Sequence, residues 1–433
     1  MKAILLSIGD ELALGQTVDT NSAWIAARLA SLGVSTVLHE TVSDDQPLIA
    51  AAIRWASTRA DLVIVSGGLG PTQDDLTRQA LADAMEVDLV TDEAALRTLE
   101  AFFASRGYEM AQRNRVQATH PVGAAMIPNP HGTAPGIAAS LHDARIFVVP
   151  GVPREMRAMV EDAVLPALAP ALRTTAPGVI LTTKINTFGL GESDVAQRLD
   201  DLMRRDQNPT VGTTVAQGMC SVRLRAEFPD PEDARARLEA TAAAVEKRLH
   251  PLAFGRDDEL LPAALLELLK REKQTLATAE SCTGGLIGAM LTDIPGSSAA
   301  YLGGWVTYTN ALKTQQLGVS AAAIDAHGAV SEPVARAMAQ GARERSGADL
   351  ALAVTGIAGP DGGTPEKPVG TVWLALASST QTLARCARFT GDRASIRDRA
   401  TKCALQMARL SLMNETLDHL RWLSLAPAKP ATA

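Results

Sequence analysis

The stretch that decides the fold of the C-terminal half of this chain is TAESCTGG, which spans Thr278–Gly285. It continues an apolar run, Thr275–Ala279, that predicts a buried strand. Its closing pair, Gly284–Gly285, opens an apolar helical segment that stops at Pro295–Gly296. A serine at a strand-to-helix turn faces the free backbone N–H groups of the helix start, which suits a nucleophile with an oxyanion or phosphate site beside it. The pattern therefore predicts Ser281 as a catalytic residue.

A serine nucleophile needs a base, and no histidine lies near Ser281 in the sequence. Lys313, at the end of GGWVTYTNALK, can take that role if the fold holds it neutral beside the serine. The alternative interpretation is a helix start at which one Ser or Thr hydroxyl caps the first turn. Capping does not explain why several reactive side chains precede the two glycines, so we favour catalysis. These side chains are Glu280, Ser281, Cys282 and Thr283.

Composition excludes several classes of protein. The length of 433 residues predicts about three domains. A net charge of −7 gives no basic surface for nucleic acid, and scattered histidines give no zinc spacing. The four cysteines form no CxxC pair, so we expect a reduced, cytoplasmic protein. No apolar run approaches the about 18 residues of a membrane span, and Asp10–Glu11 interrupts the apolar start too early for a signal peptide.

In residues 1 to 172, short apolar runs alternate with segments of helical periodicity. The predicted order is strand, helix, strand, helix and strand, at Ala3–Ile8, Asn21–Leu32, Val34–Val42, Pro47–Arg59 and Asp61–Val65. This alternation implies an α/β, doubly wound domain with a parallel sheet covered on both faces. Ligands of such sheets bind at the carboxyl ends of the strands, so the turns at those ends are candidate sites.

The turn after the third of these strands, SGGLGPTQDDLT at Ser66–Thr77, combines glycines with carboxylates. It is no dinucleotide fingerprint, because Gln73 stands where a third glycine is needed, and it lacks a P-loop lysine. Backbone N–H groups bind an anion and carboxylates bind a cation, so together they predict a metal-bridged phosphate or diphosphate. We expect the anion at Gly67, Gly68, Gly70 and Thr72, and a divalent metal at Asp74, Asp75, Asp10 and Glu11. In the alternative, Asp74 only caps the following helix.

Two later turns of the same domain carry weaker signals. NPHGTAPG (Asn129–Gly136) and PGVPRE (Pro150–Glu155) lie where the same crevice is expected, although either can be an ordinary tight turn. We expect Asn114, Gly132 and Thr133 to join the substrate-binding residues of this crevice.

Residues 173 to 255 are predicted to form a small α+β domain. Val179–Thr187 and the hairpin Val211–Phe228 have strand character, and Glu232–Leu249 has helix character. The residues indicate no chemistry, so we interpret this domain as a spacer or a dimer element.

Residues 256 to 425 are predicted to form an α/β domain around the Ser281 turn. Further strands are expected at Trp305–Thr309, Leu350–Val354 and Thr371–Ala377. A loop rich in glycine and proline follows the second of these strands and puts Thr355 and Gly356 at a strand end. Arg393, in a Gly-Asp-Arg sequence, offers a guanidinium suited to a phosphate. We expect residues 256 to 433 to fold and act alone, with residues 426 to 433 as a disordered tail.

Four stretches of the front domain resemble the N-terminal domain of the CinA (competence/damage-inducible protein) family. They are GDELALGQTVDTNSAWIAARL, SGGLGPTQDDLT, NPHGTAPG and VVPGVPREM. The resemblance implies the fold of the molybdopterin-binding proteins and an ADP-ribose pyrophosphatase that needs a divalent metal. An acidic glycine loop fits a diphosphate substrate with a metal. The small KH-like module of CinA relatives would match residues 173 to 255.

Five stretches of the back domain resemble the nicotinamide-nucleotide amidase that forms the C-terminal half of CinA proteins. They are TAESCTGG, VTYTNALK, VSEPVA, TGIAGPDGG with KPVGTVW, and GDR. The resemblance implies hydrolysis of nicotinamide mononucleotide to nicotinate mononucleotide and ammonia, without a cofactor, with Ser281 as nucleophile and Lys313 as base. We expect burial, and a neighbouring Arg393, to lower the pKa of Lys313. Glu280 and Tyr308 are then further catalytic candidates, and the substrate-binding candidates are Thr283, Gly284, Gly285, Thr355, Gly356 and Arg393.

The whole chain is thus interpreted as a bifunctional enzyme of pyridine-nucleotide salvage, and we expect a homodimer that binds neither membrane nor nucleic acid. Two alternatives stay open. The front domain can bind a pterin or nucleotide without turnover, or the protein can be an adaptor in DNA uptake or repair, as the family name suggests. The acidic balance and the pairing of Ser281 with Lys313 speak against a pure adaptor, and the acidic loop speaks against a pure binder.

Overall fold

The computed structural model describes residues 1–174, 178–216 and 218–424. They divide into two compact units, each described here by itself. Unit 1 comprises Met1–Leu181 and Ala226–Ala236, and unit 2 comprises Thr182–Arg225 and the chain from Arg237 onward. The tail that we expected to be disordered, residues 426 to 433, lies outside the described residues.

Unit 1 is built on a six-stranded sheet with the strand order β2-β1-β3-β8-β7-β6. β2, β1, β3 and β8 are parallel neighbours, and β7 and β6 continue the sheet in antiparallel pairing. The strands are β1 (Lys2–Ile8), β2 (Ser35–Val42), β3 (Leu62–Ser66), β6 (Ala125–Ile127), β7 (Gly136–Leu141) and β8 (Ala144–Val149). The predicted parallel sheet is therefore present, with an antiparallel edge that the sequence did not indicate.

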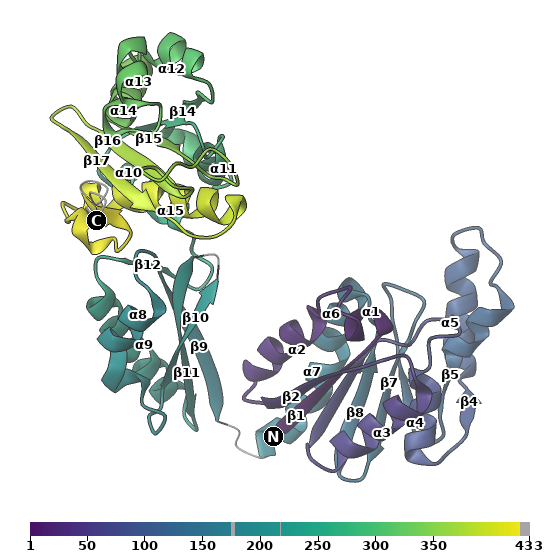
Figure 1. Cartoon of the computed structure of the whole chain (residues 1–433). Helices are drawn as coiled ribbons and strands as arrows, with labels where there is room; N and C mark the ends of the chain where they lie inside the picture. Colours follow the sequence, from purple (N-terminus) through teal and green to yellow (C-terminus); the bar gives the residue numbers. More distant parts are fainter. Residues whose placement is uncertain (175–177, 217, 425–433) are drawn as a thin grey trace. The chain divides into compact units, whose positions relative to one another are not determined.

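Helices cover both faces of this sheet, because successive strand residues point to two different apolar cores. Ile4 and Leu6 of β1 join the core beneath α3 and α4, whereas Ala3 and Leu5 join the core beneath α2, α6 and α7 (Figure 1). The helices of this unit are α1 (Asp10–Ala13), α2 (Asn21–Ala30), α3 (Gln46–Ser57), α4 (Thr77–Met85), α5 (Glu93–Ala104), α6 (Pro153–Met159) and α7 (Leu165–Thr174). A short ladder of β4 (Leu89–Thr91) and β5 (Thr119–Pro121) adjoins them. This is the doubly wound α/β domain that the alternation predicts.

The middle part of the chain forms a four-stranded sheet in the order β10-β11-β9-β12, with α8 and α9 on one side (Figure 1). The elements are β9 (Val179–Thr187), α8 (Glu192–Leu199), β10 (Thr210–Ala216), β11 (Met219–Phe228), α9 (Pro231–Leu249) and β12 (Ala253–Arg256). Burial alternates along β11, where Val222 and Leu224 are buried while Arg223 and Arg225 are exposed. The small α+β arrangement agrees with the prediction.

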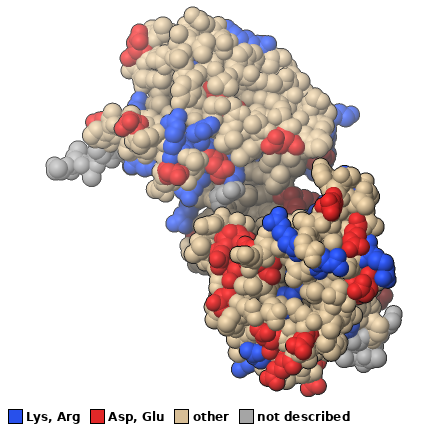
Figure 2. All heavy atoms as spheres, turned by 90° about the vertical axis from the view of Figure 1, so that its right-hand side faces the viewer, with Lys and Arg blue, Asp and Glu red and all other residues tan. Residues whose placement is uncertain are grey.

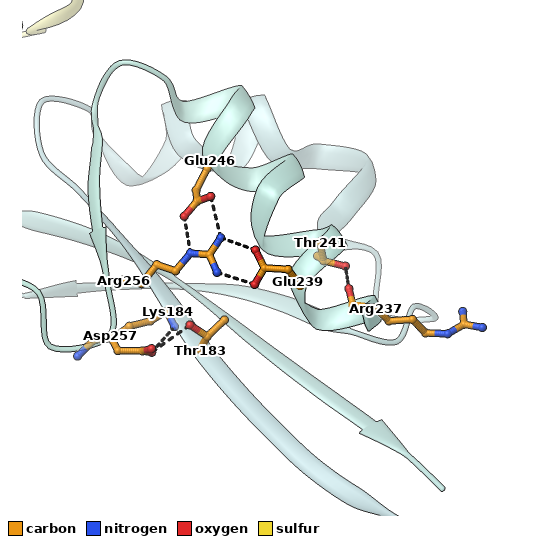
Figure 3. Close-up of polar contacts among 8 residues, drawn as sticks. All are labelled: Thr183, Lys184, Arg237, Glu239, Thr241, Glu246, Arg256 and Asp257. Atoms are coloured by element: carbon orange, nitrogen blue, oxygen red, sulfur yellow. Dashed lines mark hydrogen bonds and ion pairs between the residues drawn. The ribbon is translucent and has the colours of Figure 1, made fainter. Parts of the chain in front are cut away.

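The end of β12 is fixed by a network of charges (Figure 3). The Arg256 guanidinium donates to two carboxylates of α9, at 2.5 Å from Nε to Glu246 Oε1 and 2.7 Å from Nη1 to Glu239 Oε2. Next to it, the Asp257 carboxylate accepts from the Thr183 hydroxyl and from the Lys184 amide, each at 3.0 Å. These bonds tie the start of the back domain to the middle sheet.

The back domain contains a second six-stranded sheet, in the order β14-β13-β15-β16-β17-β18. β14 (Tyr301–Val306), β13 (Leu276–Glu280) and β15 (Leu350–Gly356) are parallel neighbours. β16 (Thr371–Ala377), β17 (Thr382–Arg388) and β18 (Leu423–Ser424) extend the sheet in antiparallel pairing. β14 ends earlier than the predicted strand Trp305–Thr309, because Thr309 caps the next helix.

Two helical layers sandwich this sheet. One core contains α10 (Leu261–Arg271), α11 (Leu286–Thr292) and α15 (Arg393–Leu412). The other contains α14 (Glu332–Ser346), with α12 (Asn310–Leu317) and α13 (Ala321–His327) beside it. On the face of the molecule drawn in Figure 2, acidic and basic side chains are interspersed, without a continuous basic stripe.

Candidate functional site

Ser281 lies where three parallel strands of the back domain end side by side. It directly follows β13, and its amide donates to the Val354 carbonyl of β15 at 2.9 Å. On the other side, the Thr307 amide that follows β14 donates to the Glu280 carbonyl at 2.8 Å. Ser281 is thereby fixed at the carboxyl edge of the sheet, where α/β sheets bind their ligands.

Lys313 reaches Ser281 from the first turn of α12. The Thr309 side chain caps this helix by accepting from the Leu312 amide at 3.2 Å. The Lys313 side chain points back along the helix, and its Nζ lies 3.0 Å from Ser281 Oγ and 2.9 Å from the Thr307 carbonyl oxygen. Only 1% of Lys313 is exposed. The structure thus brings the expected nucleophile and base into hydrogen-bond contact.

The surroundings of Lys313 shift its pKa. Burial of the side chain lowers the pKa of Lys313, and the neighbouring Cys282 opposes that shift. No acidic side chain in the described ranges forms an ion pair with Lys313 that would stabilise the charged form. Arg393, which we expected to lower this pKa further, is not among its causes, so that expectation is wrong. Burial also raises the pKa of the Cys282 thiol to about 12, so this cysteine is no rival nucleophile at neutral pH.

Glu280, which we expected among the catalytic residues, is engaged with backbone amides. Its Oε2 accepts from the amides of Gly285 and Ile287 at 3.0 and 3.1 Å, and its Oε1 accepts from the Gly288 amide at 2.9 Å. A carboxylate that receives these bonds stabilises the start of α11 and the turn before it. The geometry gives Glu280 a positioning role in place of proton transfer.

Tyr308 and Arg393 contact each other at the exposed side of the site. Arg393 Nη2 donates to the Tyr308 hydroxyl at 2.8 Å, and Nη1 donates to the Gly359 carbonyl at 2.7 Å. The backbone carbonyl of Tyr308 lies 3.5 Å from Lys313 Nζ, while the side chain of Tyr308 is 55% exposed. Both residues are thus near the pair of Ser281 and Lys313, and the tyrosine hydroxyl is bonded to the guanidinium.

The turn after Ser281 has the backbone conformation that its glycines allow. Gly284 and Gly285 have φ of +62° and +94°, which a side chain would strain. Within the described part of the chain, no backbone carbonyl accepts from the amides of Cys282 and Thr283, and the buried Thr283 hydroxyl has no partner. Two free N–H groups beside a serine are suitable donors to an oxyanion.

Arg397 also belongs to this site, although the sequence analysis did not identify it. Its Nη2 donates to the Thr283 carbonyl at 2.8 Å, which holds the turn from the side of α15. The signal available in the sequence was its position, one helical turn after Arg393 on the same helix face.

Thr355 and Gly356 end the neighbouring strand β15 as expected. The Thr355 side chain is buried, and its hydroxyl donates to the Ala329 carbonyl at 2.9 Å. This bond connects β15 to the segment before α14. Their role in substrate binding stays a prediction.

In unit 1, the carboxyl ends of β1, β3 and β8 border a cavity of about 380 Å³. The expected residues that line it are Glu11, Gly67, Gly68, Gly70, Asp74, Asp75 and Thr133. Glu155, from the stretch Pro150–Glu155 that we expected at this crevice, lines it too. Asp44 and Gln117 also line it and were not identified from the sequence. The signal available for Asp44 was its position just after β2, at the same edge of the sheet.

Two side chains fix the conformation of the glycine loop of this cavity, one from the loop itself and one from α4. Asp75 accepts from the Gly70 amide at 2.7 Å, from the Thr72 amide at 2.8 Å and from the Thr72 hydroxyl. A side chain at Gly70 would occupy the position of the Asp75 carboxylate. The buried Arg78 of α4 donates to the carbonyls of Leu69 and Gly70. Asp75 therefore shapes the loop, and its role as a metal ligand stays a prediction.

The acidic side chains here fit a hard cation in donor type. Burial raises the pKa of Asp44. A hydrogen bond from the Asp10 amide lowers this pKa, whereas the negative charges of Asp10, Glu11 and Asp74 raise it further. A cation would relieve this repulsion, and carboxylate oxygens are the ligands that Mg²⁺ and Ca²⁺ prefer. In the described residues, no three His, Cys, Asp or Glu side chains form a ready-made cage. The expected divalent metal stays a prediction.

Asn114 and Gly132 lie at the side of this cavity. The Asn114 side chain is buried and donates to Gln117 Oε1 at 3.0 Å, and Gln117 in turn lies 3.4 Å from the Thr133 hydroxyl. Gly132 lies against the Glu155 carboxylate, which leaves no room for a side chain. Asn114 thus acts on the cavity through Gln117, whereas Thr133 lines it directly.

Comparison with known proteins identifies the family. A CinA-like protein of Gemmatimonas aurantiaca is 43% identical over 416 residues, which are 96% of this chain and 97% of that protein. The chain belongs to the CinA family. A CinA-like protein of Geobacter metallireducens is 44% identical over 414 residues, covering 96% of this chain and all of that protein (100%).

Three sequence profiles divide the chain. Residues 4–170 match "Probable molybdopterin binding domain", residues 182–255 match "Damage-inducible protein CinA KH domain" and residues 258–412 match "CinA C-terminal domain". Among solved structures, the competence/damage inducible protein CihA from Agrobacterium tumefaciens is 44% identical, with a TM-score of 0.34, over 35% of this chain and 93% of that chain. In the described ranges, no helix combines the length and apolar character needed to cross a bilayer.

Proposed function

We propose that the back domain hydrolyses the carboxamide of nicotinamide mononucleotide to the carboxylate and ammonia. The observation that carries this proposal is the 3.0 Å contact between Ser281 Oγ and Nζ of the buried Lys313. A serine beside a lysine whose pKa burial lowers is an activated nucleophile without any histidine. The resemblance of this half to the nicotinamide-nucleotide amidases supplies the substrate.

We propose the following steps at these atoms. Neutral Lys313 takes the proton of Ser281 as Oγ bonds to the carboxamide carbon, and the amides of Cys282 and Thr283 donate to the resulting oxyanion. The C–N bond then breaks, and the leaving nitrogen takes the proton from Lys313 and departs as ammonia. A water then attacks the acyl-serine and gives one proton to Lys313, and Lys313 returns that proton to Ser281 Oγ as the bond between Oγ and the acyl carbon breaks. The acid released loses its remaining proton to solvent and becomes the carboxylate. Arg393, bonded to Tyr308 at the exposed side, can receive the phosphate of the mononucleotide.

The direct test is to incubate the purified full chain with nicotinamide mononucleotide and to measure ammonia. The Ser281→Ala variant should lose nearly all activity, whereas Ser320→Ala, on the surface before α13, should keep it. Ammonia release that Ser281→Ala leaves intact would reject this site as the amidase.

For the front domain we propose hydrolysis of the diphosphate of ADP-ribose, assisted by a divalent metal. The cavity of about 380 Å³ supports this, because it combines a glycine loop with the carboxylates of Glu11, Asp44 and Asp74. When bound, the metal would be held by these oxygens and would neutralise charge on the diphosphate. The chain itself supplies the Arg78 and Asp75 contacts that keep the loop in shape, and Asp75 occupies the Gly70 and Thr72 amides that we expected to bind the anion.

Release of AMP and ribose 5-phosphate from ADP-ribose, with and without added Mg²⁺, tests this second activity. Binding of ADP-ribose without turnover at any metal concentration would favour the alternative of a nucleotide-binding domain.

A further inference from the structure

A cavity of about 400 Å³ in unit 2 is lined by residues that belong to neither proposed reaction. It lies where α10, the C-terminal end of α15 and β12 meet. Its charged lining residues are Glu267, Arg271 and Arg409, and its apolar lining residues are Phe254, Ala264, Leu268 and Met413. Ligand cavities begin at about 300 Å³, so this one can hold a small organic molecule.

Arg409 is a buried cation without an anionic partner. Only 9% of Arg409 is exposed, and burial lowers its pKa to about 10, so it keeps its charge at neutral pH. Its Nη1 and Nη2 atoms donate to the carbonyls of Pro251 and Ala253. In the part of the chain that the structure describes, no carboxylate forms an ion pair with it. A guanidinium has five N–H donors, so these two carbonyls leave donors free and the charge uncompensated.

Arg271 brings a second positive charge to the same cavity. Its side chain is 72% exposed, and it forms an ion pair of 3.1 Å with Glu272, the next residue of the chain. The carboxylate that lines the cavity, that of Glu267, is paired with Lys270 at 2.9 Å. Two guanidinium groups therefore line the cavity, while the carboxylate among its lining residues already has a cation.

The rest of the wall suits an apolar group. Phe254 and Leu268 are buried apolar side chains, and Ala264 and Met413 complete this side of the cavity. Guanidinium groups bind carboxylates and phosphates through paired N–H donors. A ligand with an oxyanion at one end and an apolar body at the other would therefore supply the charge that Arg409 lacks and remove apolar surface from water.

We propose that this cavity binds a small organic anion, with its carboxylate or phosphate group against Arg271 and Arg409 and its apolar part against Phe254. The same helix, α15, carries Arg393 at its start and Arg409 near its end. The anion would thus bind a helix of the candidate amidase site about four helical turns away from Arg393. This inference does not depend on either proposed activity.

Hexanoate and inorganic phosphate are the probes, and calorimetry measures their binding to the full-length protein. Hexanoate joins a carboxylate to an alkyl chain, whereas phosphate is an oxyanion without an apolar part. Arg271→Gln should weaken hexanoate binding about tenfold, because it removes a charged hydrogen-bond donor. Lys273→Gln removes the same charge two residues away, at an exposed position outside the lining, and should leave binding within a factor of two. Ala264→Phe should abolish hexanoate binding by filling the apolar side.

The two probes also distinguish the head groups. Hexanoate binding that Arg271→Gln and Ala264→Phe weaken and Lys273→Gln does not supports a carboxylate ligand. Phosphate binding with the same dependence on Arg271 supports a phosphorylated one. The proposal is rejected if neither probe binds at millimolar concentration, if Arg271→Gln binds both as the wild type does, or if Lys273→Gln weakens binding equally. Because Arg271 is exposed, its substitution decides the question even if Ala264→Phe does not fold.

Discussion

The charge state of Lys313 decides whether Ser281 is a nucleophile. An unperturbed lysine has a pKa of about 10.4 and is charged at neutral pH, and burial lowers the pKa of Lys313 from that range. The neutral fraction therefore increases as pH rises through the lowered pKa, and amidase kcat/KM should increase with it. Lys313→Arg should lower kcat about 100-fold or more, since a guanidinium keeps its proton.

Lys273→Arg, an exposed lysine of the same domain, is the control and should keep both the activity and the pH profile. Rates of ammonia release between pH 6 and about 10 measure both expectations. An active Lys313→Arg enzyme would exclude Lys313 as the base.

At the residue scale, motif and chemistry predicted the pair of Ser281 and Lys313, but not every role around it. Spacing cannot tell which way a carboxylate points, so Glu280 was expected in catalysis although it accepts three backbone bonds. Arg393 was likewise expected to act on Lys313, whereas it reaches the Tyr308 hydroxyl. Side-chain direction depends on backbone angles at the turn, which no pattern of residue types specifies.

At the scale of elements, the start of α11 depends on Glu280. Glu280→Gln keeps one carbonyl oxygen but directs an amide N–H₂ group at backbone N–H donors, and it loses the charge that assists these bonds. We expect a loss of about 1–3 kcal/mol in the free energy of unfolding, together with lower kcat because the turn beside Ser281 loosens. Urea unfolding and ammonia release measure the two effects.

Glu332→Gln, in the first turn of α14, is the matched control and should change stability little, because its partner Arg336 is partly exposed. If the Glu280→Gln enzyme has unchanged stability but no activity, Glu280 acts directly in catalysis.

The glycine loop before α4 depends on Asp75 in the same way. Asp75→Asn removes the negative charge to which the Gly70 and Thr72 amides donate hydrogen bonds. The rate of ADP-ribose hydrolysis should therefore fall at least about tenfold, while amidase activity stays unchanged. If Asp75 also binds the metal, the Mg²⁺ concentration for half-maximal rate should rise, whereas a loop-shaping role lowers the rate at every Mg²⁺ concentration. Undiminished, metal-independent hydrolysis would contradict both roles.

At the scale of the whole molecule, the sequence pattern predicted the parallel parts of the sheets, because strands that are buried on both faces are continuous apolar runs. It did not predict the antiparallel edge of β7 and β6, since β6 has only three residues and β7 begins at Gly136, the last residue of a stretch rich in glycine and proline. The domain borders, the homodimer and the cytoplasmic location stay predictions. The border at residue 255 deserves a test, since one apolar core includes Phe188 and Leu252 of the middle segment together with Leu420 of the back domain.

Our last prediction therefore revises the expectation that residues 256 to 433 are stable alone. The buried Arg409 guanidinium of α15 donates to the Pro251 and Ala253 carbonyls at 2.8 Å each, and Gln406 lies 3.3 Å from the Phe188 carbonyl. A fragment that begins at residue 256 lacks all of these acceptors and also both carboxylates that hold Arg256 (Figure 3). We expect it to melt well below a fragment of residues 178 to 433, because it loses these hydrogen bonds and exposes the part of the apolar core that Phe188 and Leu252 cover.

The substitution Arg409→Met distinguishes the loss of these hydrogen bonds from a general loss of contacts. It should lower the melting temperature of the long fragment, where two carbonyls lose their donor, and change that of the short fragment little, because water hydrates the guanidinium there. Circular dichroism of the four proteins measures the difference, and ammonia release at low temperature shows whether each retains the Ser281 site. If the two unsubstituted fragments melt at the same temperature, the middle segment contributes nothing to the stability of the back domain. The domain border at residue 255 would then be where the sequence predicted it.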